Sequence, residues 1–124
     1  MILFIPGVPK STQTGSIIRT PDGRAFPSRR GSAWLAYVKH SMAVYAHEKQ
    51  LVCATGPLEV TIAFNVPRIK DKRRVVPTTR PDLDNLLKGL LDCGNGILWC
   101  DDAQIVRLVL EKQYADQPGV WIGW

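Results

Sequence analysis

An alternating segment at residues 58–66 places the strongest constraint on how this chain folds. Its apolar side chains occur at every second position, namely Leu58, Val60, Ile62, Phe64 and Val66. A period of two puts these side chains on one face of a β-strand. Pro67 ends the segment, because proline has no amide hydrogen for a sheet ladder. The chain must therefore build a sheet with a buried face, which other elements have to cover.

Two helices are expected to cover that sheet. Apolar residues spaced by three and four predict a first helix at about 33–51, with Ser32 as its cap; they are Leu35, Val38, Met42 and Tyr45. A second helix follows Pro81 and ends near Gly94 and Gly96. Its apolar stripe follows the spacing i, +3, +4, +7 and +8 and comprises Leu83, Leu86, Leu87, Leu90 and Leu91.

Shorter apolar runs predict the remaining strands, at residues 2–5, 97–99, 105–112 and 120–124. The order β-α-β-α-β-β-β predicts an α+β fold, with a mixed sheet of four to five strands and two main helices. A length of 124 residues fits one domain, spanning 1–124.

Composition excludes several classes of protein. No apolar run approaches the length of a membrane span, and the N-terminus lacks a signal-peptide pattern. The three cysteines form no CxxC pair, which argues against a disulfide scaffold and fits the reducing cytoplasm. His40 and His47 stand two helical turns apart, too far to share a zinc ion. The net charge of +5 favours a polyanionic partner.

The basic residues concentrate in two loops. Residues 9–31 are rich in glycine and proline and predict a long functional loop, with the basic residues Lys10, Arg19, Arg24, Arg29 and Arg30. Residues 68–80 contain a single acid and six basic residues, Arg68, Lys70, Lys72, Arg73, Arg74 and Arg80. Such a segment can follow the phosphates of a nucleic acid, or it can simply be a solvated surface. The four tryptophans lie in apolar segments and are expected in the core or at an interface.

Four aspartates gather around the second expected helix. Asp82 and Asp84 lie at its start, and Asp101 and Asp102 follow the short strand that returns beside it. Asp82 and Asp84 can converge only if Asp82 lies at or before the helix cap, in extended backbone. Clustered carboxylates without histidine or cysteine favour Mg²⁺ or Mn²⁺, which can activate water against a phosphodiester. Lys88, one turn after Asp84, could then stabilise negative charge.

The same acids have structural interpretations. Asp82 can be an ordinary cap, Asp84 and Lys88 can be an i,i+4 ion pair, and Asp101–Asp102 can be a polar turn.

The combined motif resembles that of the RusA-type Holliday junction resolvases. It runs from Arg80-Pro81-Asp82-Leu83-Asp84-Asn85-Leu86-Leu87-Lys88 through Leu91-Asp92 to Asp101-Asp102-Ala103-Gln104-Ile105. The opening Pro6-Gly7-Val8-Pro9-Lys10 and the closing Lys112 are also similar. The resemblance covers residues 58–113 well, while the loop at 11–31 and the first helix match only in general character.

The resemblance implies a homodimeric, Mg²⁺-dependent endonuclease that resolves four-way DNA junctions by paired symmetric cuts, in recombination and repair. It implies Asp82, Asp84 and Asp102 as the essential metal-binding carboxylates, Asp101 as auxiliary and Lys88 as an assistant in catalysis. The expected DNA contacts are the six basic residues of 68–80 together with Lys10, Arg29, Arg30 and Lys112. The residues alone do not choose between Asp101 and Asp102, since neighbours in a strand point to opposite faces. The alternatives are a non-catalytic protein that binds branched DNA, and an interaction domain whose acids only cap a helix.

Overall fold

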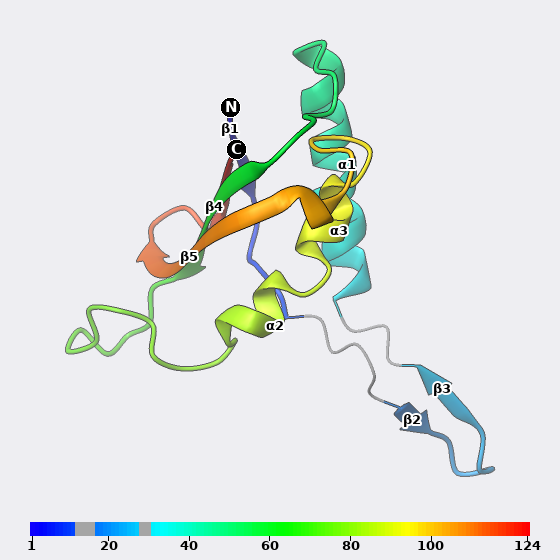
Figure 1. Ribbon diagram of the computed structural model, residues 1–124. Helices are drawn as coiled ribbons and strands as arrows, with labels where there is room; N and C mark the ends of the chain where they lie inside the picture. The colour runs from blue at the N-terminus through cyan, green and yellow to red at the C-terminus, as the bar shows by residue number, and fades with distance from the viewer. Residues whose placement is uncertain (12–16, 28–30) are drawn as a thin grey trace.

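A mixed sheet forms the centre of the molecule in the computed structural model, which describes residues 1–11, 17–27 and 31–124 (Figure 1). Its strands are β1 (Ile2–Pro6), β4 (Leu58–Pro67), β5 (Ile105–Ala115) and β6 (Gly119–Gly123), in the order β1-β6-β4-β5. β4 pairs in parallel with β5 and antiparallel with β6, which in turn pairs antiparallel with β1. The expected mixed sheet and α+β class are confirmed.

The helices cover one face of this sheet (Figure 1). They are α1 (Ser32–Glu48), α2 (Leu83–Leu87) and α3 (Leu90–Gly94). Val60, Ile62 and Phe64 of β4 are fully buried, as the alternating pattern predicts, and pack in one cluster with Val38 and Met42 of α1. The burial of this apolar face is the main term that stabilises the fold.

The second expected helix is not continuous, and this part of the prediction was wrong. The chain leaves the helix at Lys88, and Gly89 has a φ of 82°, in the left-handed region. A Cβ at position 89 would lie 2.6 Å from Leu35 Cδ1, so α1 approaches the backbone closely there. Leu86 and Leu90 are nevertheless buried, because both short helices turn the same apolar stripe toward the core.

Two other local predictions need correction. Ser32 does not cap α1; Gly31 holds the cap position, with a φ of 78° that glycine adopts without strain. Residues 97–99 form no strand and instead make a turn, although Leu98 and Trp99 are buried as their apolar character suggests. Trp99 forms single bridges with Ala54 and Asn95, which fasten this turn to the rest of the chain.

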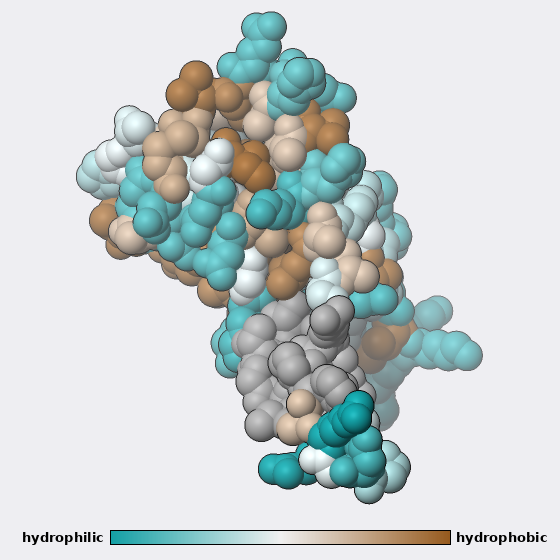
Figure 2. Space-filling model, turned by 90° about the vertical axis from the view of Figure 1, so that its right-hand side faces the viewer, coloured by the Kyte–Doolittle hydropathy of each residue, from teal (hydrophilic) through white to brown (hydrophobic). Residues whose placement is uncertain are grey.

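The basic N-terminal loop contains structure that its composition did not predict. β2 (Ile17–Arg19) and β3 (Ala25–Pro27) pair as an antiparallel hairpin that extends away from the sheet (Figure 1). The end of this hairpin is hydrophilic (Figure 2). Arg24 forms an ion pair with Asp22 at its turn.

No helix in the part of the chain that the structure describes is long and apolar enough to cross a membrane.

Candidate active site

Asp82 stands at the N-terminal end of α2 with its carboxylate outside the helix hydrogen-bonding pattern. Its backbone is extended, with φ −74° and ψ 149°, as convergence with Asp84 requires. Its carbonyl accepts the first helical hydrogen bond, from Leu86. Among the described residues, however, its side chain accepts no capping hydrogen bond from the helix. Asp82 and Asp84 are both exposed, and the Asp82 carboxylate does not cap the helix.

Lys112 of β5 holds the segment that leads into Asp82. Its ammonium group donates hydrogen bonds of 2.8 Å to the carbonyl oxygens of Thr79 and Pro81. Both carbonyls belong to the chain immediately before Asp82. Lys112 was expected to contact DNA, whereas these bonds give it a structural partner in the protein backbone. The side chain therefore positions the Asp82 segment against the edge of the sheet.

Asp101 and Asp102 occupy the turn between Trp99 and β5, where residues 102–104 form a short 3-10 helix. Asp101 is its cap: its carboxylate accepts a hydrogen bond from the Ala103 amide, and Gln104 accepts one from the Asp101 amide. The capping interpretation thus holds for Asp101, whose side chain is already engaged. Asp102 makes no such cap and is half-buried.

The backbone of Asp102 is anchored by Asn95 at the end of α3. The Asn95 side-chain oxygen accepts hydrogen bonds from the Asp102 amide, at 2.8 Å, and from the indole nitrogen of Trp99, at 3.1 Å. Because Trp99 is fully buried, the position of Asp102 is tied to the core.

Asp92 of α3 is a further member of this acidic group, and it was not among the residues expected at the site. Partial burial and the neighbouring Asp101 carboxyl raise the pKa of Asp102 above its usual value, and the charge of Asp92 adds to this effect. The spacing contains a signal, because Asp92 lies eight residues after Asp84 and would share its side of a regular helix. The break at Gly89 interrupts that regular spacing.

The carboxylates of Asp82, Asp84 and Asp102 do not form a preorganised metal site. In the described ranges, no group of three His, Cys, Asp or Glu side chains lies close enough to hold one metal ion. Like charges repel each other when no cation is present, and side chains that stand apart relieve this repulsion. The expected set of Asp82, Asp84 and Asp102 therefore stays a prediction. The donor chemistry fits a hard cation, because it consists of carboxylate oxygens and because Asp102 already carries excess neighbouring negative charge.

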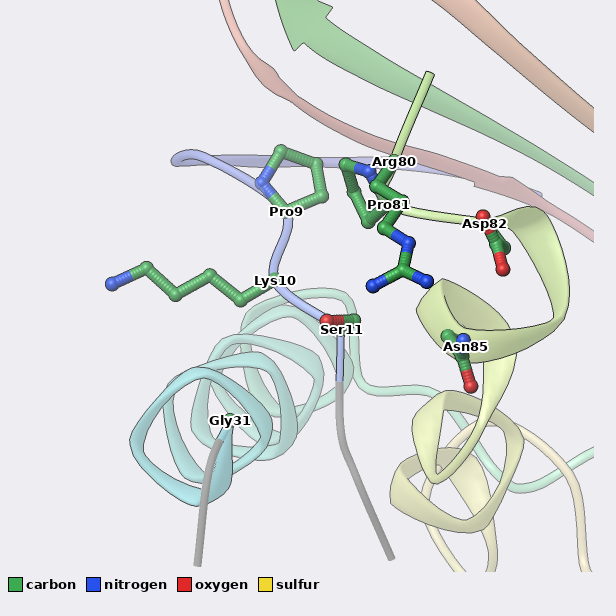
Figure 3. Close-up of a pocket in the computed structure, with 8 residues that line it drawn as sticks. All are labelled: Pro9, Lys10, Ser11, Gly31, Arg80, Pro81, Asp82 and Asn85. Carbon is green, nitrogen blue, oxygen red and sulfur yellow. The ribbon is translucent and has the colours of Figure 1, made fainter. Parts of the chain in front are cut away.

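A hollow of about 610 Å³ opens beside Asp82 (Figure 3). It is lined by Pro9, Lys10, Ser11, Gly31, Arg80, Pro81, Asp82 and Asn85. The Arg80 guanidinium extends into the space between Ser11 and Asn85, while Lys10 points away from Asp82 (Figure 3). A phosphate in this hollow would meet a cation from Arg80 beside the carboxylate of Asp82.

The basic segment at 68–80 lies close to this site in the chain, and several of its cations already have partners. Arg68 pairs with Asp116 at 2.9 Å, and Arg73 pairs with Asp71 at 3.0 Å. No ion pair among the described residues involves Lys70, Lys72 or Arg74. Exposed pairs contribute little stability, so phosphates can compete for their cations. Arg29 and Arg30, also expected to contact DNA, lie outside the described residues.

Comparison with known proteins decides the family. The family model of the endodeoxyribonuclease RusA matches residues 6–123. The chain belongs to the RusA endodeoxyribonuclease family. It is also 31% identical over 105 residues to an uncharacterized protein of Bacillus subtilis strain 168, YqaN, and the match covers 73% of each chain.

The RusA match includes every acidic residue discussed above. It also includes Lys88, the last position of the Asp82–Lys88 motif, whose amide donates to the Asp84 carbonyl at the end of α2. The resemblance noted from the sequence is thereby confirmed at the level of the family. Endodeoxyribonuclease activity and action on branched DNA are properties of that family.

Proposed function

We propose that this protein is a metal-dependent endodeoxyribonuclease that resolves four-way DNA junctions by paired, symmetric phosphodiester cuts. RusA membership supports the reaction class. The single observation that carries the assignment to these residues is the Asp82 carboxylate, which stands at a helix start and caps nothing in the described chain. A carboxylate that only caps α2 would accept a helix amide instead.

Asp82, Asp84 and Asp102 are the proposed ligands of one Mg²⁺ or Mn²⁺ ion, with Asp101 in an auxiliary role. Two observations support this division. The Asp101 carboxylate accepts a hydrogen bond from the Ala103 amide, whereas the pKa of the Asp102 carboxyl is raised by its surroundings. When bound, such an ion lowers the pKa of a water molecule and stabilises charge on a phosphodiester.

The protein's own cations would place the DNA strand. Arg80 would bind a backbone phosphate in the hollow beside Asp82, and Lys88 would stabilise the negative charge that develops during cleavage. Lys70, Lys72 and Arg74 would follow the flanking phosphates, assisted by Arg68 and Arg73 once DNA competes for their ion pairs. Lys10 would contribute from the opposite edge of the hollow. Arg29 and Arg30 retain the role expected from the sequence.

Two symmetric cuts need two sites, and a two-fold homodimer supplies them. The sheet face opposite the helices is the proposed interface. Phe4 and Trp121 stack there with ring centroids 4.7 Å apart, and Trp121 is 43% and Ile2 68% exposed. Burying such side chains against a second copy would stabilise the dimer. Trp124 packs edge-on against Tyr45 and Trp99 instead.

A cleavage assay on a synthetic four-way junction tests the proposal. With Mg²⁺ the protein should cut the junction and leave linear duplex intact, and chelation should stop cleavage. Asp84→Asn should abolish cutting and leave junction binding unchanged or tighter, because the lost group repels phosphate. Glu48→Gln, which changes an exposed carboxylate at the end of α1, is the matched control and should cut normally.

Two outcomes would contradict the proposal. Cleavage by Asp84→Asn at near the parent rate would remove this carboxylate from the site. Tight junction binding with no cleavage under any Mg²⁺ or Mn²⁺ concentration would indicate the non-catalytic alternative. A thermal shift on adding Mg²⁺, absent in Asp84→Asn, would report metal binding independently of cutting.

A further inference from the structure

Two thiols from distant parts of the chain meet beside the Asp101 turn. The sulfur atoms of Cys53 and Cys100 lie 2.7 Å apart, although the residues are 47 positions apart in sequence. Cys100 is exposed and Cys53 is half-buried, so solvent reaches the pair. Both cysteines are in the reduced form, as is Cys93. The candidate nuclease chemistry uses neither sulfur.

The backbone holds this pair in place from both sides. Ala54, next to Cys53, forms a bridge with Trp99, next to Cys100. The Ala54 amide donates to the Leu98 carbonyl at 2.9 Å, and the Cys100 amide donates to the Ala54 carbonyl at 3.2 Å. Trp99 is fully buried, which fixes the turn to the core. These backbone contacts therefore hold the two cysteines side by side, so the proximity of the sulfurs does not depend on a chance side-chain rotamer.

A second link comes from Gln104. Its side-chain nitrogen donates to the carbonyl oxygens of Ala54, at 3.1 Å, and Gly56, at 2.9 Å. The segment 53–56 is thus fastened to the turn that carries Asp101 and Asp102. Bringing the sulfurs from 2.7 Å to the length of a disulfide needs an approach of only about 0.7 Å.

We propose that Cys53 and Cys100 form a dithiol modification site that a peroxide oxidises to an intramolecular disulfide. In the first step the Cys100 sulfur attacks one peroxide oxygen, which gives a sulfenic acid on Cys100 and releases water. In the second step the Cys53 sulfur attacks the sulfenic sulfur, forms the S–S bond and releases a second water. The two thiols lose two electrons and two protons in total, and one peroxide is reduced to two waters.

Cys93 provides an internal comparison. It is 7% exposed, and its thiol donates to the Gly89 carbonyl inside α3 at 3.2 Å. Peroxide reaches it poorly, and no other sulfur in the described chain is paired with it. Cys93 should remain a thiol while the Cys53–Cys100 pair reacts.

The full chain tests the proposal directly. After treatment with excess hydrogen peroxide, the intact mass should fall by two hydrogens, and peptide mapping without reductant should show a peptide that joins Cys53 to Cys100. The melting temperature should rise by on the order of 10 °C relative to the reduced protein, because the bond closes a long loop of the unfolded chain. Dithiothreitol should reverse both changes.

Single serine variants separate the outcomes. Cys53→Ser and Cys100→Ser should each lose the joined peptide and the rise in melting temperature, while Cys93→Ser should keep both. A gain of oxygen atoms on Cys100 without a joined peptide would overturn the proposal, as would a disulfide that involves Cys93 or a second chain. These measurements do not depend on nuclease activity, so the proposal can fail or succeed independently of the proposed function.

Discussion

Lys112 donates a hydrogen bond of 2.8 Å to the carbonyl oxygen of Pro81, the residue directly before Asp82. A second bond of the same length reaches Thr79, so one ammonium group bridges two carbonyls of the segment. This relationship connects the sheet to the candidate active site. It explains how an extended Asp82 can be held at the start of a helix of only five residues.

Replacing Lys112 tests this connection. Lys112→Met should lower the free energy of unfolding by about 1–3 kcal/mol, because the exposed Thr79 and the half-buried Pro81 each lose a charged donor to their carbonyl oxygen. It should also raise the Mg²⁺ concentration needed for half-maximal cutting by on the order of tenfold. Lys112→Arg, which keeps a cation with several donors, should recover part of the Mg²⁺ response. The measurements are chemical denaturation and cleavage rates in a Mg²⁺ titration.

The same variants decide whether Lys112 contacts DNA. If Lys112 only positions the Asp82 segment, Lys112→Met should leave the salt dependence of junction binding unchanged in metal-free buffer. If Lys112→Met flattened that dependence and left the Mg²⁺ response intact, the original expectation of a DNA contact would be restored. Lys49→Met, at the exposed end of α1, is the control for loss of one positive charge.

Asp102 should make stability depend on pH. Its pKa is raised in the folded state, so its contribution to stability is fully present below the unfolded pKa of about 3.9 and is lost as the pH rises through the folded value. At neutral pH its ionised carboxylate is repelled by Asp92 and Asp101. Asp102→Asn should therefore melt about 2 °C higher than the parent at neutral pH in the presence of a chelator.

The sign of this effect is checked by melting curves across the acidic range. The advantage of Asp102→Asn should shrink as the pH falls and vanish once the parent carboxyl is protonated. An advantage that stayed constant with pH would show that Asp102 is not the group whose ionisation destabilises the turn.

The basic segment should control the salt dependence of DNA binding. Substitution of both Arg73 and Arg74 by alanine should reduce the slope of log affinity against log salt by about 1–2 for a four-way junction. The expected reduction is at the lower end if Asp71 keeps Arg73 from the phosphates, because the two form a paired contact in the free protein. Fluorescence anisotropy at several salt concentrations measures the slope. An unaltered slope would exclude these residues from the interface.

A side chain at position 89 should destabilise the fold. Gly89→Ala combines a φ of 82° with a Cβ 2.6 Å from Leu35 Cδ1, and should cost about 2–4 kcal/mol of stability. Gly96→Ala is the matched comparison, because its φ is 73° but no atom lies within 4 Å of the added Cβ. It should cost only about 1–2 kcal/mol. Equal losses in the two variants would show that the contact with Leu35 adds nothing.

Local sequence patterns were enough to predict several elements of the fold. The alternation at 58–66 predicted β4 and its buried face, and the spacing of leucines identified the side chains that α2 and α3 bury. The combined aspartate and lysine motif was sufficient to indicate the RusA family. These features follow from periodicity and residue chemistry, which can be read within a short segment without knowledge of the rest of the chain.

Features that depend on contacts between distant segments are visible only in the folded molecule. Leu35 of α1 lies against the break at Gly89, and the role of Lys112 depends on β5 lying beside the chain at Thr79–Pro81. The raised pKa of Asp102 depends on its partial burial, on Asp101 and on Asp92, and a continuous helix would have placed Asp92 differently. Tertiary packing overrides local conformational preference where it buries apolar surface or satisfies polar groups. The distances between such segments are not contained in a linear sequence pattern.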